Sequence, residues 1–133
     1  MYLLDSNVCI RLLNQRDHRI EQQFRNHTPS EIALCSVVKA ELLYGARHSQ
    51  RIESNLHRLE LFFSPLVSFS FDDSCAEVYA RIRHELTVYG QLIGPNDLLI
   101  AAIAIANNAV LVTHNQGEFG RISGLQLSDW EVD

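Results

Sequence analysis

Acidic side chains stand beside apolar segments at widely separated places in this chain. Asp5 comes directly after the apolar run at residues 1–4, and Asp97 follows a Gly94-Pro95 turn at the start of a long apolar segment. An ionised carboxylate next to apolar residues is costly unless something compensates its charge. Carboxylate oxygens that gather without basic partners are typical of a site for a hard divalent cation.

Four more polar side chains could join these two acids. Glu41 lies about one turn into a predicted helix, and Thr113, Asn115 and Glu118 end or follow a late apolar strand. Each acid alone has an ordinary explanation, as a turn residue, a solvated helix residue or a surface acid. Together they predict a site, because ligands of open parallel sheets bind beyond the carboxyl ends of the strands.

The repulsion between such acids indicates what else the site needs. Two carboxylates about 4 Å apart repel by about 4 kcal/mol at an effective dielectric constant of about 20, which corresponds to a pKa rise of about 3 units. No Lys or Arg is adjacent to Asp5 or Asp97, and the only lysine is Lys39. We therefore expect a hard divalent cation, Mg²⁺ or Mn²⁺, to neutralise a site built from such acids. Such an ion would activate water and stabilise charge on a phosphodiester oxygen.

Strands and helices alternate along the chain and would position these residues. Apolar runs predict strands at 1–4, 31–36, 66–69, 109–113 and, at an edge, 125–127. Helical patterns fall at 8–13, 16–25, 37–47, 48–63, 72–89 and 94–106, with Ser36 and either Asn96 or Asp97 as helix caps. Residues 37–63 would form a helical hairpin or one bent rod. The alternation predicts one three-layer α/β/α domain over residues 1–133, with a mainly parallel sheet.

Composition excludes several classes of protein. With 133 residues and 47% hydrophobic content the chain can bury a core, and a net charge of −5 argues against a protein that only holds nucleic acid. Cys9, Cys35 and Cys75 are odd in number and lack C-x-x-C spacing, so we expect buried thiols. No apolar run reaches about 18 residues and no basic leader precedes Asp5, which favours a cytoplasmic protein without a membrane span.

The motifs around these residues resemble those of a known family. They are Asp5 after a short strand, Ser36-x₄-Glu41-Leu42-x₂-Gly45, Gly94-Pro95-x-Asp97-x₂-Ile100-Ala101-Ala102, Val112-Thr113-x-Asn115-x₃-Phe119 and the ending Gly124-Leu125-x-Leu127-x₂-Trp130. In this order they are similar to PIN-domain ribonucleases of the VapC type, the toxins of type II toxin–antitoxin systems. The likeness covers essentially the whole chain.

This resemblance implies a Mg²⁺-dependent endoribonuclease, with Mn²⁺ substituting, that cleaves a structured RNA such as tRNA. It also implies a cognate antitoxin, a homodimer and metal binding by Asp5, Glu41 and Asp97. Many relatives carry a fourth Asp where this chain has Asn115, and Glu118 could supply the missing charge instead. Thr113 resembles the family's hydroxyl at this edge, a hydrogen-bond donor to water or phosphate.

Three arginines share one predicted helical face. Arg47, Arg51 and Arg58 are spaced i, i+4 and i+11. They could contact phosphates of the substrate, or they could form a solvated face of the hairpin. The apolar stripe of the same hairpin could face a partner, and the resemblance places an antitoxin groove there.

Other functions fit the sequence less well. A phosphotransfer receiver domain needs a lysine after its last strand, and Lys39 lies far from it. A haloacid-dehalogenase-type phosphatase would show D-x-D-x-T where this chain reads Asp5-Ser6-Asn7-Val8-Cys9. A module that binds RNA or protein without catalysis, with a vestigial acidic site, remains the alternative from a different class.

Overall fold

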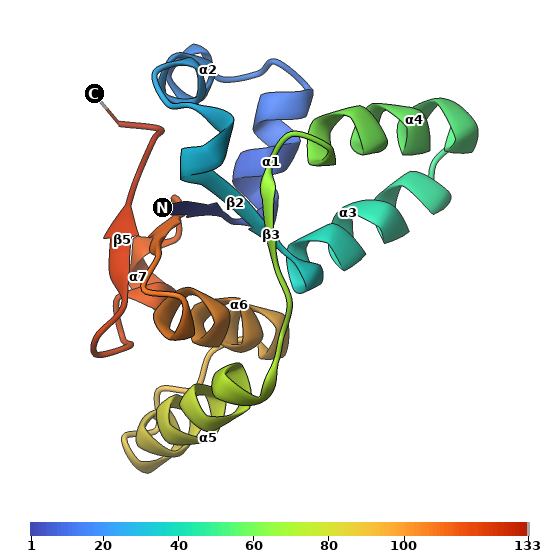
Figure 1. The fold of residues 1–133 in the computed structure, drawn as a ribbon. Coiled ribbons are helices and arrows are strands. Elements are labelled where there is room, and N and C mark those ends of the chain that lie inside the picture. Colours follow the sequence, from blue (N-terminus) through green and yellow to red (C-terminus); the bar gives the residue numbers. More distant parts are fainter. Residues whose placement is uncertain (133) are drawn as a thin grey trace.

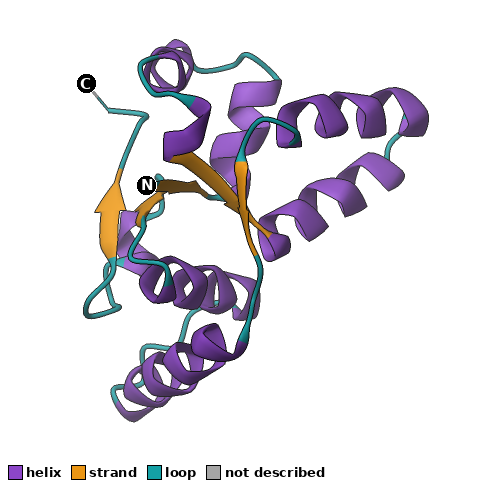
Figure 2. Ribbon diagram, viewed as in Figure 1, coloured by secondary structure: helices purple, strands orange, loops and turns teal. Residues whose placement is uncertain are grey.

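The computed structural model describes residues 1–132, which form a five-stranded sheet with helices on both faces (Figures 1 and 2). Its strands are β1 Tyr2–Leu4, β2 Ile32–Cys35, β3 Val67–Phe69, β4 Val110–Val112 and β5 Gln126–Ser128. They lie in the order β3-β2-β1-β4-β5, and every neighbouring pair is parallel. The predicted three-layer α/β/α architecture is therefore confirmed.

The helices divide between the two faces of the sheet. They are α1 Ser6–Leu13, α2 His18–Arg25, α3 Ser36–Arg47, α4 Ile52–Phe63, α5 Asp73–Val88, α6 Pro95–Ala106 and the short α7 Gln116–Phe119, with a 3₁₀ turn η1 at Pro29–Glu31. Figure 1 shows α5 and α6 on one face and α1 and α2 on the other, while α3 and α4 project sideways as a hairpin. Within residues 1–132, no helix combines the length and apolar character needed to cross a bilayer.

Helix α6 is the most deeply buried helix in the structure. Ile100, Ala101, Ala102, Ile103 and Ala104 are each at most 1% exposed, as expected for a helix buried on most sides. Small alanine side chains let this helix approach both the sheet and α5 closely, and such a close-packed core has low compressibility. The first turn of α6 is thus held on a rigid support.

Two predicted helix caps are wrong. Gly94 occupies the N-cap of α6 and makes no side-chain capping bond, so neither Asn96 nor Asp97 caps the helix and the Asp97 carboxylate is left for other contacts. Cys35 occupies the N-cap of α3. The Ser36 hydroxyl instead donates to the carbonyl oxygen of Phe69 at 3.3 Å, which ties α3 to the end of β3.

The three cysteines are buried and unpaired, as the sequence predicts. Cys9 and Cys35 are 0% exposed, and burial raises the pKa of both thiols. Protonated thiols of this kind are poor nucleophiles and pack as small apolar groups.

Candidate acidic active site

The sheet has a topological switch point between β1 and β4. The chain proceeds from β1 to β2 and β3 on one side, and then returns to place β4 on the other side of β1. Ligands of open α/β sheets bind at such points, outside the carboxyl ends of the strands. Asp5 follows β1 and Thr113 follows β4, and the Thr113 hydroxyl donates to Asp5 Oδ2 at 2.5 Å.

Two donors fix the orientation of the Asp5 carboxylate. Asp5 is 7% exposed, and its Oδ1 accepts from the backbone N–H of Asn7 at 2.7 Å. The Thr113 hydroxyl also accepts from the backbone N–H of Asn115 at 3.1 Å and is itself fully buried. Because its single proton is given to Asp5, Thr113 orients that carboxylate and does not donate to water or phosphate as expected. Each Asp5 oxygen keeps a lone pair for a further partner.

Ser6 connects the end of β1 to α3. It is the first residue of α1, and its hydroxyl donates to Glu41 Oε1 at 2.8 Å. Glu41 is partly buried in the second turn of α3, so this bond directs its carboxylate toward the carboxyl end of β1. Sequence reasoning missed Ser6, although its position next to Asp5 was a signal that could have found it.

Asn115 and Glu118 form a reciprocal pair at the start of α7. Asn115 is the N-cap; its Oδ1 accepts from the Glu118 N–H at 3.3 Å, and its Nδ2 donates to Glu118 Oε2 at 2.7 Å. Both ends of the Asn115 amide are therefore engaged by Glu118. The amide orients that carboxylate, and Glu118 supplies the negative charge of this loop.

The negative charges of the other three acids act on the Asp97 carboxyl. It lies half-buried in the first turn of α6. Burial, followed in order of size by the negative charges of Asp5, Glu118 and Glu41, raises its pKa from 3.8 to about 6. A charge has such an effect only at short range in a partly buried site. The structure thus brings four carboxylates from four separated segments to one edge of the sheet.

These four carboxylates lack basic partners. Within residues 1–132, no Lys or Arg nitrogen lies within 4.0 Å of Asp5, Glu41, Asp97 or Glu118. The donor set consists of oxygen atoms, and their charge is uncompensated; both properties fit a hard divalent cation.

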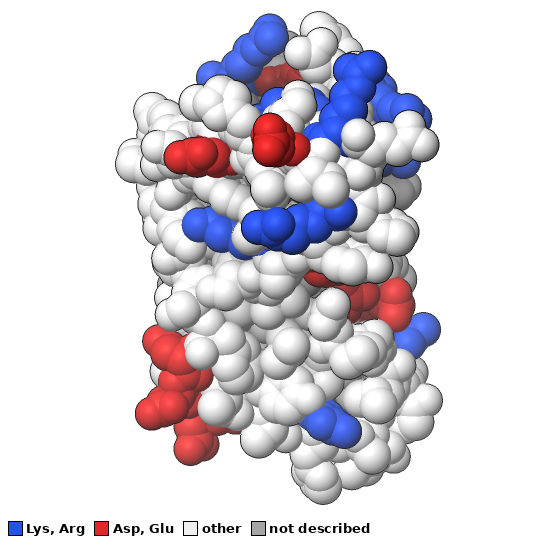
Figure 3. Space-filling model, turned by 90° about the vertical axis from the view of Figure 1, so that its right-hand side faces the viewer, with Lys and Arg blue, Asp and Glu red and all other residues white. Residues whose placement is uncertain are grey.

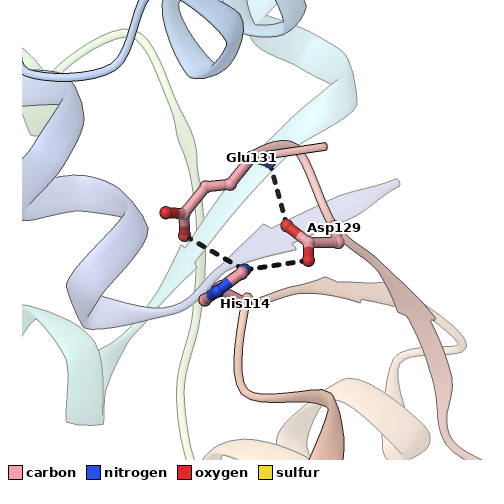
Figure 4. Close-up of side chains that lie close together, drawn as sticks. All are labelled: His114, Asp129 and Glu131. Atoms are coloured by element: carbon pink, nitrogen blue, oxygen red, sulfur yellow. Dashed lines mark hydrogen bonds and ion pairs between the residues drawn. The ribbon is translucent and has the colours of Figure 1, made fainter. Parts of the chain in front are cut away.

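A second cluster is packed more tightly (Figure 4). His114, Asp129 and Glu131 offer ligand atoms that all lie within 4.8 Å of one another. Among the described residues, no three of the four carboxylates at the switch point come together this closely. His114 Nδ1 lies 2.9 Å from Asp129 Oδ2 and 3.9 Å from Glu131 Oε2. Glu131 also pairs with Arg11, at 3.4 Å from Nε, so this cluster contains its own positive charge. Sequence reasoning missed it, because His114 follows the strand predicted at 109–113 whereas Asp129 and Glu131 follow the one predicted at 125–127.

The three predicted phosphate-binding arginines lie along the α3–α4 hairpin. The prediction that they share one helical face is wrong, because the helix breaks between Arg47 and Ile52. Arg47 ends α3 and Arg51 precedes α4; both are exposed. Arg58 donates from Nη2 to the carbonyl oxygen of Leu13 at 2.6 Å and so ties the hairpin to α1. Figure 3 shows Lys and Arg side chains gathered in bands on the side from which the hairpin projects. Arg47 is six residues beyond Glu41, or about 9 Å along the helix axis.

An apolar groove of about 280 Å³ runs between α1 and this hairpin. Its walls include Ile10, Leu13, Leu42 and Leu59, and Glu41 lies at its edge. Ile10 is 44% exposed. The groove therefore joins an uncovered apolar surface to the acidic site.

Comparison with known proteins gives consistent matches over the whole chain. Residues 2–125 match the family model described as PIN domain. Ribonuclease VapC2 of Rickettsia felis is 42% identical over 135 residues, which cover 98% of each chain. The tRNA(fMet)-specific endonuclease VapC of Shigella flexneri is 35% identical over 129 residues, or 97% of each chain.

The fold is also similar to solved structures. The crystal structure of VapBC2 from Rickettsia felis bound to a DNA fragment from their promoter superposes with a TM-score of 0.88 at 41% identity. The match covers 97% of this chain and 98% of that one.

Proposed function

The chain belongs to the PIN-domain family, and we propose that it is a metal-dependent endoribonuclease, the toxin of a VapC-type toxin–antitoxin pair acting in the cytoplasm. The observation that supports this most strongly is the set of four carboxylates at the β1–β4 switch point. Three of them raise the pKa of the fourth, and none has a basic partner among the described residues. A fold gains nothing from such repulsion, so the arrangement favours a function that needs negative charge.

Asp5, Glu41 and Asp97 would hold the ion, which we propose to be Mg²⁺ with Mn²⁺ as a substitute. When bound, such an ion supplies Lewis-acid chemistry that stabilises negative charge on a phosphate group and favours hydrolysis. Glu118 is our choice for the fourth acidic position in place of Asn115, because the Asn115 amide is engaged with Glu118 at both ends.

The residues around the acids would hold them in place for the reaction. Thr113 and the Asn7 N–H fix Asp5, and the Ser6 hydroxyl fixes Glu41. Ordered supporting hydrogen bonds of this kind orient ligands and tune their affinity for metal. We therefore assign Thr113 and Ser6 to positioning, and the carboxylates to metal binding.

The RNA substrate is proposed from the relatives. A metal-assisted hydrolysis does not use the 2′-OH, so the acids alone do not select RNA over DNA. The Shigella flexneri relative is named a tRNA(fMet)-specific endonuclease, and we propose a tRNA as the substrate of this chain too. Arg47 and Arg51, exposed on the hairpin, would contact its phosphates.

A cognate antitoxin and a second copy of the chain are the proposed protein partners. The solved Rickettsia felis neighbour is a VapBC assembly. The apolar groove between α1 and the hairpin, with exposed Ile10 on its wall, would accept an apolar segment of the antitoxin beside Glu41.

The test is cleavage of purified bacterial tRNA. Wild-type protein should cut it with Mg²⁺ or Mn²⁺ and lose activity in EDTA. Asp5→Asn and Asp97→Asn should each reduce cleavage by at least about 100-fold, whereas Asp73→Asn, an exposed acid in the first turn of α5, should not. RNA binding with no cleavage by the wild type would favour a non-catalytic module instead.

A further inference from the structure

A polar groove opens beside the acidic site and differs from the apolar one. It has a volume of about 660 Å³ and runs along α1 toward the C-terminal segment. We call it the α1 groove, and its polar lining includes Asn7, Arg11, Arg16, His114, Asn115 and Glu131.

The α1 groove begins at the proposed catalytic carboxylate. The Asn7 N–H donates to Asp5, and the Asn115 N–H donates to the Thr113 hydroxyl that holds Asp5. Both asparagines also line the groove. A polynucleotide strand whose reacting phosphate lies near Asp5 could therefore continue directly along α1.

Basic side chains line the groove in a protein whose net charge is −5. Arg11 and Arg16 lie at the C-terminal end of α1 and just beyond it, and both are exposed. Arg16 has no ion pair or side-chain hydrogen bond among the described residues. Two guanidinium groups next to a carboxylate site suit a polynucleotide strand: the carboxylates would lie at the reacting phosphate, and the guanidinium groups would bind the phosphates that follow it along the strand.

Arg11 forms an ion pair with a buried acid. Glu131 is 6% exposed, and its Oε1 lies 3.4 Å from Arg11 Nε. The Glu131 N–H donates to Asp129, whose other oxygen lies 2.9 Å from His114 Nδ1 (Figure 4). This contact uses Nε, and no other ion pair of Arg11 occurs in residues 1–132. The two terminal nitrogens of Arg11 are thus available for a ligand while its stem is fixed.

We propose that the α1 groove binds the sugar–phosphate backbone of the RNA substrate, with Arg11 and Arg16 contacting phosphates and Glu131 as a positioning residue for Arg11. This inference rests on the proposed ribonuclease function. It assigns the strand a path along α1 that does not include the hairpin arginines. The α1 groove adjoins the apolar groove, because Ile10 and Asn14 line both.

The test measures binding without cleavage. Fluorescently labelled bulk bacterial tRNA is titrated with full-length protein in EDTA at several salt concentrations. Arg11→Ala and Arg16→Ala should each weaken binding about tenfold and reduce the slope of log K against log salt by about 1. Arg81→Ala is the matched control: its side chain is 50% exposed against 48% for Arg11, and it pairs with Glu85 at 3.6 Å. That variant should bind like the wild type.

The Glu131→Gln variant distinguishes two effects of Glu131 on RNA binding: positioning of Arg11, and simple repulsion of the phosphates by its negative charge. Removing a negative charge beside a phosphate site should tighten RNA binding if only the net field matters. If Glu131 preorganises Arg11, the variant should bind about threefold more weakly, and the loss should vanish in an Arg11→Ala background. Urea unfolding shows whether Glu131→Gln is folded. Arg16→Ala tests the groove independently, since the Arg16 side chain makes no hydrogen bond or ion pair among the described residues.

Three outcomes would overturn the inference. Unchanged RNA affinity in Arg11→Ala and Arg16→Ala, with wild-type cleavage intact, would remove the α1 groove from the substrate path while leaving the ribonuclease proposal standing. Unchanged RNA affinity together with weakened antitoxin binding would assign the groove to the protein partner. Tighter binding by Glu131→Gln would reject the positioning role.

Discussion

Replacing Asp97 with Asn should stabilise the metal-free protein at neutral pH, although it should abolish activity. The pKa of Asp97 is raised to about 6 in the folded state, by burial and then by Asp5, Glu118 and Glu41. The folded state therefore binds a proton more tightly than the unfolded state does. As pH rises from about 4 through 6, the unfolded state ionises first, and the free energy of unfolding of the wild type falls.

The size of this effect follows from the shift. A rise in pKa from 3.8 to about 6 corresponds to at most about 3 kcal/mol of free energy of unfolding. Roughly two-thirds of that loss falls between about pH 4.5 and about pH 7.5. Because the Asp97 carboxyl is only half-buried, water screens part of the interaction. We therefore expect the free energy of unfolding of Asp97→Asn, relative to that of the wild type, to rise by about 1 kcal/mol between about pH 4.5 and about pH 7.5.

Urea unfolding of both proteins in EDTA at the two pH values measures this difference. Asp72→Asn is a control, because hydrogen bonds from Ser74 and Cys75 lower the pKa of Asp72 below 3.8. That shift changes stability only below about pH 4, so the stability of this variant relative to the wild type should stay constant between the two pH values. Adding Mn²⁺ should then stabilise the wild type and leave Asp97→Asn unchanged, since only an ion bound to the native state shifts unfolding. A wild type as stable as Asp97→Asn at about pH 7.5 without metal would refute the reasoning.

Three other changes have distinct expected results. Thr113→Val removes the buried donor to Asp5 and should lower the free energy of unfolding by about 1.5–3 kcal/mol, measured with urea, while raising the Mn²⁺ concentration needed for cleavage. Glu118→Gln should keep the fold and weaken Mn²⁺ binding by about 10-fold or more in calorimetry; unchanged binding would exclude it from the site. Ile103→Ala, at a fully buried position of α6, should cost about 2–5 kcal/mol of stability yet leave the cleavage rate per folded molecule unchanged.

The layers of the fold could be predicted because each strand is a short apolar run between helical patterns. Residues such as Leu111 and Val112 are fully buried, and a strand covered on both faces needs continuous apolar sequence. The helix α7 was missed, as its four residues are too few to show a period of 3.6. It depends on the Asn115 cap, which is a local hydrogen bond that an apolar pattern does not reveal.

The meeting of distant acids could be anticipated for a topological reason. Parallel strands end at one edge, so Asp5 after β1 and the loop after β4 had to be neighbours once the strand order was known. The supporting bonds could not be foreseen, because Ser6 reaches Glu41 only through the packing of α1 against α3. Glu131 is buried at the end of the chain, where a charged residue is ordinarily exposed, and no local pattern distinguishes it.

The central claim is that a divalent cation binds among Asp5, Glu41 and Asp97. Crystals of the full chain soaked in Mn²⁺, with diffraction recorded at the manganese absorption edge, test it directly. The account predicts an anomalous peak between Asp5 and Asp97 that is lost in Asp97→Asn. A peak only at His114, Asp129 and Glu131, or no peak near Asp5, would contradict it.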